Sequence, residues 1–334
     1  MSLYDDVFSF SNLLYAERMT RKGKRGKKDV IAYEQMLGGN IYDLYERLRK
    51  REYTVSPYHF FEIFEPKRRE IQALRYEDRI VQRCLMDNYL SELLKRHLIF
   101  DNAACRKGKG TDFARNRLKG FLRALNRKGE VYVLQYDIHH FFESIPHDRL
   151  KEKLKRLVSD SEMLSFLFKI IDSFNEESGM GLPMGNQTSQ AFALFYLDEI
   201  DRLLKECFQV EGYVRYMDDG IALSHSLRLL QTALMELSSR LSLLGLSLNP
   251  KKTGVYPAKN GISFLGFRFL LGKNGETYLR IEKKKARRAL RYLAEKNSIQ
   301  SIDTYLSYVS RAKERELSSC LKKMRGVLAK SKNG

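Results

Sequence analysis

Two spacings of apolar residues alternate along the chain and predict its elements. Alternating apolar and polar residues, or runs of β-branched and aromatic residues, predict strands at 58–64, 131–136, 213–217, 221–223 and, as a pair, within 262–269. Apolar residues three or four positions apart predict helices at about 41–51, 78–98, 146–157 and 226–244, and from 282 onward. A further helix is predicted within 184–204, beginning after a polar loop that ends at Ser189. Interspersed strands and helices predict an α+β fold with a basic helical tail.

An acidic segment, Asp218-Asp219-Gly220, joins two of these strands, and we predict that it forms a tight turn. A hairpin tip with paired carboxylates can hold a hard divalent cation such as Mg²⁺. A solitary acidic turn is usually only solvated, so this segment alone leaves both interpretations open.

The charge balance favours a polyanionic partner. The 334 residues include 60 Lys and Arg against 41 Asp and Glu, a net charge of +19, and such a field attracts nucleic acid first. An anionic membrane surface is the alternative, but the basic residues are spread over several segments instead of one amphipathic helix. The basic run 21–28 is predicted to be a solvated loop or an arm that binds nucleic acid.

The amino-acid composition further limits what kind of protein this is. Hydrophobic residues make up 43% of the chain, enough for a sizeable core and two or three subdomains. The cysteines form no CxxC pair, which disfavours a zinc site or a disulfide framework. Because the sequence has neither a leader pattern nor an apolar run of about 18 residues, we expect a cytoplasmic protein without a membrane partner.

A further acidic residue, Asp137, ends the strand 131–136 and lies 81 residues before Asp218. Alone, Asp137 is more simply explained as a helix N-cap or a strand-end turn. If the strand and the acidic hairpin pair in one sheet, three carboxylates meet at its edge. Such a cluster suits phosphoryl transfer with two metal ions.

Segments 137–145 and 216–219, the latter Tyr-Met-Asp-Asp, resemble the two acidic palm motifs of reverse transcriptases. Other motifs follow in that family's order. Segments 66–71 and 78–82 resemble the fingers hairpin of the bacterial enzymes, where basic side chains hold the incoming triphosphate. The resemblance assigns this role to Lys67 and Arg69, although either one alone would be interpreted as a solvated surface charge.

The Gly-punctuated basic loop 101–111 resembles the next fingers block, which implies contacts of Arg106 and Lys109 with the template backbone. In segment 245–253, Lys252 matches a lysine that can protonate pyrophosphate as a general acid, and we prefer it to Lys251.

Phe142 lies five residues after Asp137, where the family has an aromatic ring under the nucleotide sugar that selects deoxynucleotides. The alternative is that Phe141 or Phe142 is core; the two point to opposite faces if the backbone is extended. We interpret His139 and His140 as exposed or template-facing, not as zinc ligands.

Segment 181–190 resembles the palm motif that contacts the template and the nascent base pair, and Gly185 would let the backbone pass close to that pair. Most group II intron and retron enzymes have Gln before this Gly and Pro after the Ser, whereas this chain has Met184 and Gln190. This pattern, together with segment 11–16 and the Gly-Lys-Arg cluster after it, resembles the reverse transcriptases of diversity-generating retroelements.

The turn Phe264-Leu265-Gly266 resembles the primer grip, although an ordinary hydrophobic hairpin would have the same pattern. The whole resemblance implies a right-hand fold in three parts. These are an N-terminal segment with fingers (1–130), a palm of antiparallel sheet backed by helices (131–270, with a fingers-side insertion around 150–180), and a small basic helical thumb (271–334).

The resemblance also implies RNA-directed DNA synthesis with two Mg²⁺ ions, for which Mn²⁺ can substitute. Asp137 and Asp218 would be the main ligands, with Ile138 in the ligand set and with Asp219 in electrostatic support and ligating in some steps. The implied partners are template RNA, the RNA–DNA hybrid, dNTPs and an oligomeric accessory variability protein. The product would be cDNA with frequent errors opposite adenine, which diversifies a target gene.

Two different functions stay open beside this one. One is that of a reverse transcriptase of the retron, abortive-infection or group II intron-derived kind. The other is that of a non-catalytic polymerase relic kept as an RNA-binding module, against which the three intact aspartates argue.

Overall fold

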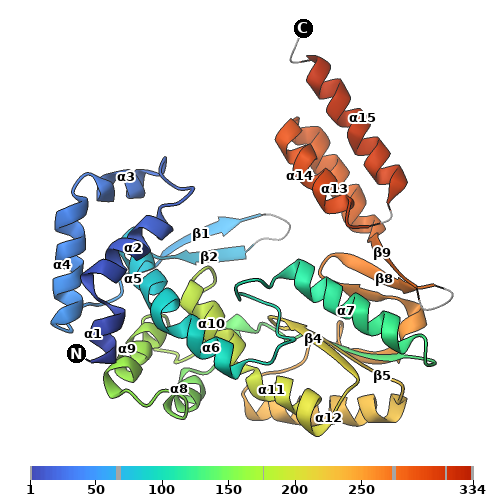
Figure 1. Ribbon diagram of the computed structural model, residues 1–334, viewed down its shortest axis with the longest axis horizontal. Coiled ribbons are helices and arrows are strands. Elements are labelled where there is room, and N and C mark those ends of the chain that lie inside the picture. Colours follow the sequence, from blue (N-terminus) through green and yellow to red (C-terminus); the bar gives the residue numbers. More distant parts are fainter. Residues whose placement is uncertain (1, 65–68, 176, 273–275, 313, 332–334) are drawn as a thin grey trace. The chain divides into compact units, whose positions relative to one another are not determined.

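The computed structural model describes residues 2–64, 69–175, 177–272, 276–312 and 314–331. It divides into two compact units, each of which is described by itself. The first unit comprises Met1–Gly108, Ile138–Leu203 and Leu237–Asn249, and the second comprises Lys109–Asp137, Leu204–Glu236 and Pro250–Gly334. Figure 1 shows the elements of both units.

The first unit is mainly helical. Its helices are α1 (Leu3–Val7), α2 (Phe10–Thr20), α3 (Lys28–Glu34), α4 (Leu37–Arg49), α5 (Tyr76–Leu85), a π-helix (Met86–Leu90), α6 (Ser91–His97), a 3₁₀ turn (Phe142–Ser144), α8 (His147–Lys155), α9 (Ser161–Asp172), α10 (Gln187–Tyr196) and α11 (Asp198–Arg202). Apolar residues at helical spacing, such as Ile41, Leu44 and Leu48 of α4, are fully buried and form its core. Strands β1 (His59–Ile63) and β2 (Arg69–Ala73) form an antiparallel hairpin.

The second unit contains the principal sheet. Strands β3 (Tyr132–Tyr136), β4 (Gly212–Tyr216), β5 (Asp219–Ser224) and β6 (Gly254–Pro257) form it in the order β4-β5-β3-β6, and all neighbours are antiparallel. Helix α7 (Thr111–Leu125) packs on β4 and β5 through buried residues such as Leu118 and Leu122. The central strand β3 therefore holds its carboxyl end between β5 and β6.

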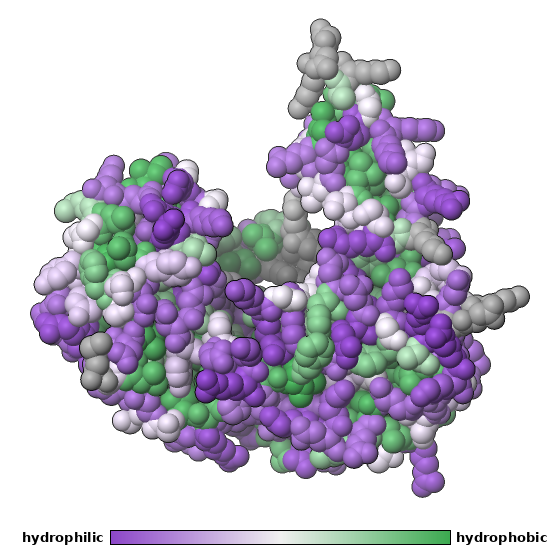
Figure 2. Space-filling model, viewed as in Figure 1, coloured by the Kyte–Doolittle hydropathy of each residue, from purple (hydrophilic) through white to green (hydrophobic). Residues whose placement is uncertain are grey.

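A second sheet and three helices complete this unit. Strands β7 (Ile262–Phe264), β8 (Phe267–Leu271) and β9 (Thr277–Ile281) form an antiparallel sheet. Helices α13 (Lys283–Lys296), α14 (Ile299–Val309) and α15 (Arg315–Ser331) follow, and hydrophilic residues cover much of their visible face (Figure 2). A short helical turn (Ala258–Asn260) also belongs here. The π-helix Leu203–Cys207 and the helix α12 (Leu227–Leu243) are each divided between the two units.

The structure confirms the α+β class with antiparallel sheets. The predicted start of the helix within 184–204 is wrong, because Gln187, Thr188 and Ser189 already form the first turn of α10. Residues 21–27 of the basic run form a mostly exposed loop, as predicted, and Lys28 already begins α3. The right-hand arrangement and its three-part division stay predictions. Within the described residues, the helices are too short or too polar to cross a membrane.

Candidate active site

The acidic hairpin has a shorter turn than the sequence suggested. Tyr216 of β4 pairs directly with Asp219 of β5, so Met217 and Asp218 alone form the turn. The predicted turn at Asp218-Asp219-Gly220 is therefore wrong, because Asp219 and Gly220 begin the second strand. Met217 has φ +55°, and a positive φ at the first of two turn residues is typical of a type II′ hairpin. The fully buried Arg215 donates a hydrogen bond of 2.7 Å from Nη1 to the Met217 carbonyl.

Gly220 has a packing role in place of a turn role. A Cβ atom at Gly220 would lie 2.1 Å from Cζ of Tyr136, its partner in β3. The Tyr136 ring thus lies directly against the glycine, and its hydroxyl is 2.7 Å from that of Tyr213. This contact holds the carboxyl end of β3 beside the hairpin.

The sheet register brings Asp137 between an acid and a base. Tyr136 is paired with Gly220 in β5, and Gln135 is paired with Gly254 in β6. Continuing both registers to the next position along β3 sets Asp137 opposite Asp219 on one side and Lys252 on the other. Directly opposite residues share a face of the sheet. Accordingly, Lys252 Nζ lies 2.7 Å from Asp137 Oδ1, and Asp137 is only 4% exposed.

The carboxylates on this sheet edge interact electrostatically. Burial raises the pKa of Asp219 to about 7, and the nearby charges of Asp218 and Asp137 add to the effect while Lys252 opposes it. Burial, and then the charge of Asp137, also raise the pKa of Asp218. On the other side, the hydrogen bond to Asp137 raises the pKa of Lys252. Such mutually perturbed groups are typical of functional sites.

The donor set fits a hard divalent cation, because Mg²⁺ and Mn²⁺ prefer carboxylate oxygens and this cluster concentrates negative charge. Among the described residues, however, no group of three or more His, Cys, Asp or Glu side chains has a metal-binding arrangement, and the group that faces Asp137 is Lys252. The ion sites therefore stay predictions. Ile138, assigned to the same ligand set, forms an isolated bridge with Leu248.

Phe142 belongs to the first unit. It begins the 3₁₀ turn Phe142–Ser144, so the idea of an extended backbone at these two phenylalanines is wrong. Phe141 is buried and Phe142 is half-buried, which leaves one ring in the core and the other partly accessible. His139 and His140 are exposed, as predicted, and His140 Nδ1 lies 2.6 Å from Glu143 Oε2.

The segment assigned to the nascent base pair is held by partners that the sequence did not suggest. The Met184 main-chain N–H donates to Gln72 Oε1 at 2.9 Å, and Gly185 has φ +112°. Gln190, in the first turn of α10, accepts a hydrogen bond of 3.1 Å from Cys105 Sγ. Cys105 lies in the predicted fingers loop 101–111, whereas Gln72 lies just outside the segments that the sequence singled out, and neither contact was predicted.

The basic residues of the predicted fingers differ in environment. Lys67 lies outside the described residues, and Arg69 begins β2 opposite Ile63. Arg106 donates from Nη1 to the carbonyls of Ile99 and Asn102, at 2.7 and 3.3 Å, and so holds its own loop. In the second unit, Lys109 Nζ lies 4.8 Å from the ring centroid of Phe113.

The turn assigned to the primer grip joins β7 and β8. Leu265 and Gly266 have φ +45° and +87°, which is the type I′ geometry. Arg115 Nη1 donates to the Leu265 carbonyl, and the Tyr308 hydroxyl donates to the Gly266 carbonyl, both at 3.3 Å. Phe264, before the turn, is buried. Sequence reasoning missed both donors, because neither belongs to a recognisable motif.

Comparison with known protein families agrees with this geometry. The family described as reverse transcriptase (RNA-dependent DNA polymerase) matches residues 65–269, more than half of the chain. The matched range includes Asp137, the acidic hairpin and Lys252. Enzymes of this family bind template RNA and dNTPs and generally use divalent metal ions. The chain belongs to the reverse transcriptase family and is an RNA-directed DNA polymerase, a nucleotidyltransferase.

Proposed function

We propose that this reverse transcriptase copies a template-repeat RNA into cDNA by two-metal phosphoryl transfer at Asp137, Asp218 and Asp219. The observation that carries the catalytic part is the carboxylate cluster on the edge of the β4-β5-β3-β6 sheet. Three carboxylates interact there, and a lysine contacts one of them. A purely structural ion pair would need one carboxylate and would not need two more beside it.

Within this site, Asp137 and Asp218 would hold the ions, and Asp219 would increase the negative charge around them. Divalent ions bound there would activate the primer hydroxyl and stabilise the charge on the leaving pyrophosphate. Lys252 is kept protonated by Asp137, since their hydrogen bond raises its pKa. Once its hydrogen bond to Asp137 is released, the Lys252 ammonium is a proton donor for the leaving group.

Primer extension on an RNA template with Mg²⁺ tests the catalytic assignment. The substitution Asp218→Asn keeps the side-chain volume and removes a charge, so we expect template-dependent extension to fall to background. Binding of a primer–template hybrid should stay within about threefold of wild type, because phosphate contacts dominate that affinity.

Extension by Asp218→Asn at the wild-type rate would contradict the assignment. Lack of extension by the wild-type protein, with its cognate RNA and accessory protein supplied, would favour the non-catalytic relic. The genes beside this one would distinguish a diversity-generating enzyme from a retron enzyme. A template repeat with a matching variable repeat supports the diversity-generating role, whereas a structured retron RNA supports a retron enzyme.

Error-prone copying at adenine is the finer part of the proposal. Met184 supports it, because this half-buried side chain replaces the Gln that most related enzymes carry, and its main chain is fixed by Gln72. We expect Met184→Gln to change misincorporation opposite template adenine, measured by sequencing of cDNA. Met180→Gln, at a more exposed methionine outside the motif, is the matched control. Equal error spectra for wild type and Met184→Gln would remove the idea.

A further inference from the structure

His147 is a buried histidine with no part in the proposed catalysis. It is the first residue of α8, a helix that packs on α9 and α10 (Figure 1), and only 3% of it is exposed. Gly181 and Asp172, which its ring faces, belong to the same first unit. Burial of a polar ring is unfavourable unless the ring is hydrogen-bonded, so its partners indicate what it does.

The ring of His147 holds the first residue of segment 181–190, which was assigned to the nascent base pair. Its Nε2 atom lies 2.7 Å from the carbonyl oxygen of Gly181. Because a carbonyl oxygen only accepts, Nε2 carries the hydrogen and donates it. The main-chain N–H of the same histidine donates to the Gly179 carbonyl at 2.9 Å. His147 therefore binds the chain at both ends of residues 179–181.

The peptide unit between Gly181 and Leu182 is held on two sides. Its carbonyl accepts the hydrogen bond from His147, and its N–H, which belongs to Leu182, donates to the Phe142 carbonyl at 2.7 Å. The carbonyl and the N–H of a trans peptide lie in one rigid plane and point in opposite directions. The two bonds together fix the orientation of this plane relative to Phe142.

The backbone at Gly181 makes these bonds necessary. Gly181 has φ +89°, and a Cβ atom there would lie 3.2 Å from the main-chain oxygen of Glu143. A glycine has the widest choice of backbone conformations, so its own preference does not set the orientation of the following peptide. Without the donor on His147, that peptide could rotate and carry the rest of segment 181–190 with it.

The second nitrogen of the ring, Nδ1, distinguishes His147 from a packing residue. It is buried and has no hydrogen-bond partner among the described residues. The carboxylate oxygen Oδ1 of Asp172 lies 3.5 Å away, and Lys151 Nζ lies 2.5 Å from Asp172. An unsatisfied buried nitrogen is unfavourable, and a leucine would avoid this cost. The bond to Gly181 is therefore the feature that requires a histidine.

We propose that His147 is a positioning residue for DNA synthesis, which fixes segment 181–190 against Phe142 through the Gly181–Leu182 peptide. The inference rests on the proposed function in one respect, the assignment of Met184 in this segment to the nascent base pair. A segment that can shift accepts mispaired nucleotides more easily. Loss of the Nε2 donor should therefore increase both the main-chain mobility of the segment and the frequency of errors.

Hydrogen exchange of the full chain, followed by mass spectrometry without nucleic acid, tests the contact itself. We expect the amides of residues 181–184 to exchange about tenfold faster in His147→Leu than in wild type. His147→Gln should stay within about threefold of wild type, because its side-chain amide can donate in place of Nε2. Leu150→Ala, at a fully buried residue of the same helix, is the matched control and should also stay within about threefold. Thermal unfolding checks that all three variants fold.

Sequencing of cDNA tests the consequence for synthesis. We expect His147→Leu to raise misincorporation opposite template adenine about threefold or more, whereas His147→Gln and Leu150→Ala should copy with the wild-type error spectrum. An error frequency is a ratio of products, so a smaller fraction of folded enzyme does not change it. A merely structural role of His147 would lower the yield of cDNA and leave this ratio unchanged.

Equal exchange of residues 181–184 in wild type and His147→Leu would overturn the proposal, and so would an equal increase in Leu150→Ala. An unchanged error spectrum in His147→Leu would overturn it as well. If Met184→Gln copies as wild type while His147→Leu makes more errors, the role of the Met184 side chain is removed and that of His147 stands. If the wild-type protein extends no primer, the proposed catalysis fails, and the exchange comparison alone decides whether His147 holds the segment.

Discussion

At the residue scale, Gly220 shows how a small residue next to the catalytic carboxylates is fixed by its neighbour. The Tyr136 ring occupies the space that a Cβ atom would need. We therefore expect Gly220→Ala to lower the free energy of unfolding by about 1–3 kcal/mol, the usual cost of overpacking. Urea unfolding measures this change.

The same sheet offers a matched control at Gly254. A Cβ atom there would meet no heavy atom within 4 Å, and its φ is not positive. Gly254→Ala should therefore change stability little. An equal loss in the two variants would show that the Tyr136 contact does not determine the glycine at position 220.

The same residue explains why sequence reasoning misplaced the hairpin turn. A glycine after two aspartates is a common turn pattern. Nothing in the sequence reveals that Gly220 is instead required because the Tyr136 ring of β3 lies against it. The three aspartates themselves could be identified from motif order. The contact of Lys252 with Asp137 could not, because it depends on β6, a four-residue strand whose pairing has no sequence signal.

At the scale of elements, the sequence predicted the helices and strands whose apolar residues recur at a regular spacing. It did not predict the helix bounds where polar residues are buried. Strand β3 and helix α4 lie close to their predicted positions because their apolar residues follow one period. In contrast, Thr188 and Ser189 are buried in α10. Such residues are typical of loops, so tertiary packing, which the sequence does not reveal, decides their conformation.

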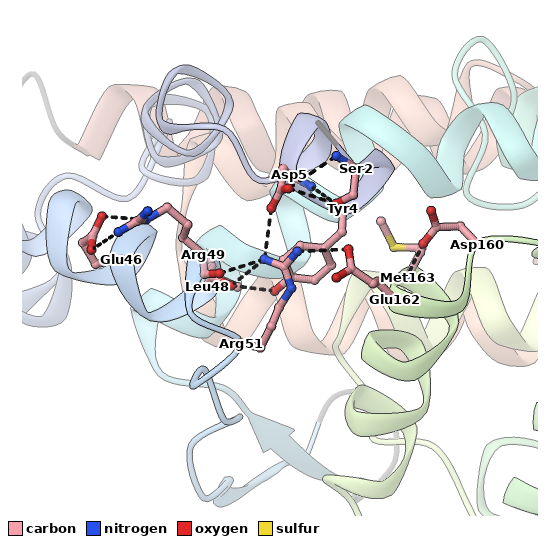
Figure 3. A network of polar contacts seen from close by, with 10 residues as sticks. All are labelled: Ser2, Tyr4, Asp5, Glu46, Leu48, Arg49, Arg51, Asp160, Glu162 and Met163. Atoms are coloured by element: carbon pink, nitrogen blue, oxygen red, sulfur yellow. Dashed lines mark hydrogen bonds and ion pairs between the residues drawn. The ribbon is translucent and has the colours of Figure 1, made fainter.

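One arginine connects helices α1 and α9 in the first unit (Figure 3). Arg51 donates to Asp5 Oδ1 and to Glu162 Oε2, both at 3.0 Å, and its guanidinium lies 4.1 Å from the Tyr4 ring centroid. Burial opposes ionisation of Asp5, but hydrogen bonds from Arg51 and Ser2 outweigh it and lower the pKa. Hydrogen bonds from Ser2 and Arg51 also lower the pKa of Glu162.

This bridge predicts a pH-dependent contribution to stability. A carboxyl whose pKa is lower in the folded protein stabilises it above the unfolded pKa, here 3.8 for Asp5 and 4.5 for Glu162, and that stabilisation is lost as the pH falls through the folded pKa. Arg51→Met should therefore lower the Tm by about 2 °C at pH 7, a modest effect expected for partly exposed pairs. The difference from wild type should shrink below about pH 4.

Arg49→Met is the control, because the exposed Arg49 pairs with Glu46 within α4 and, among the described residues, forms no other ion pair. It should change the Tm less than Arg51→Met at pH 7. A difference between wild type and Arg51→Met that persists unchanged at pH 3 would mean that the cation–π contact, and not the ion pairs, supplies the stabilisation.

At the scale of the whole molecule, a net charge of +19 coexists with a cluster of carboxylates on the principal sheet. The positive field should dominate binding of nucleic acid, since neutralising each phosphate releases counterions. We expect the affinity for an RNA–DNA hybrid to fall by about a thousandfold or more between about 50 and 200 mM salt, if six or more phosphates are contacted. Fluorescence anisotropy at several KCl concentrations measures the slope of log Kd against log salt.

The exposed cations at the start of α13 test where this field acts. Lys283 and Lys284 are exposed, and each phosphate contact that is removed should reduce the slope by about one. Lys283→Gln/Lys284→Gln should therefore lower it by up to about two, while Lys95→Gln/Arg96→Gln, whose charges already pair with Glu92, should change it less. Because the charge lost is equal in the two variants, equal slopes would mean that only net charge matters and that α13 does not contact the hybrid. A smaller slope for the α13 variant alone would identify this helix as a surface that follows the nucleic-acid backbone.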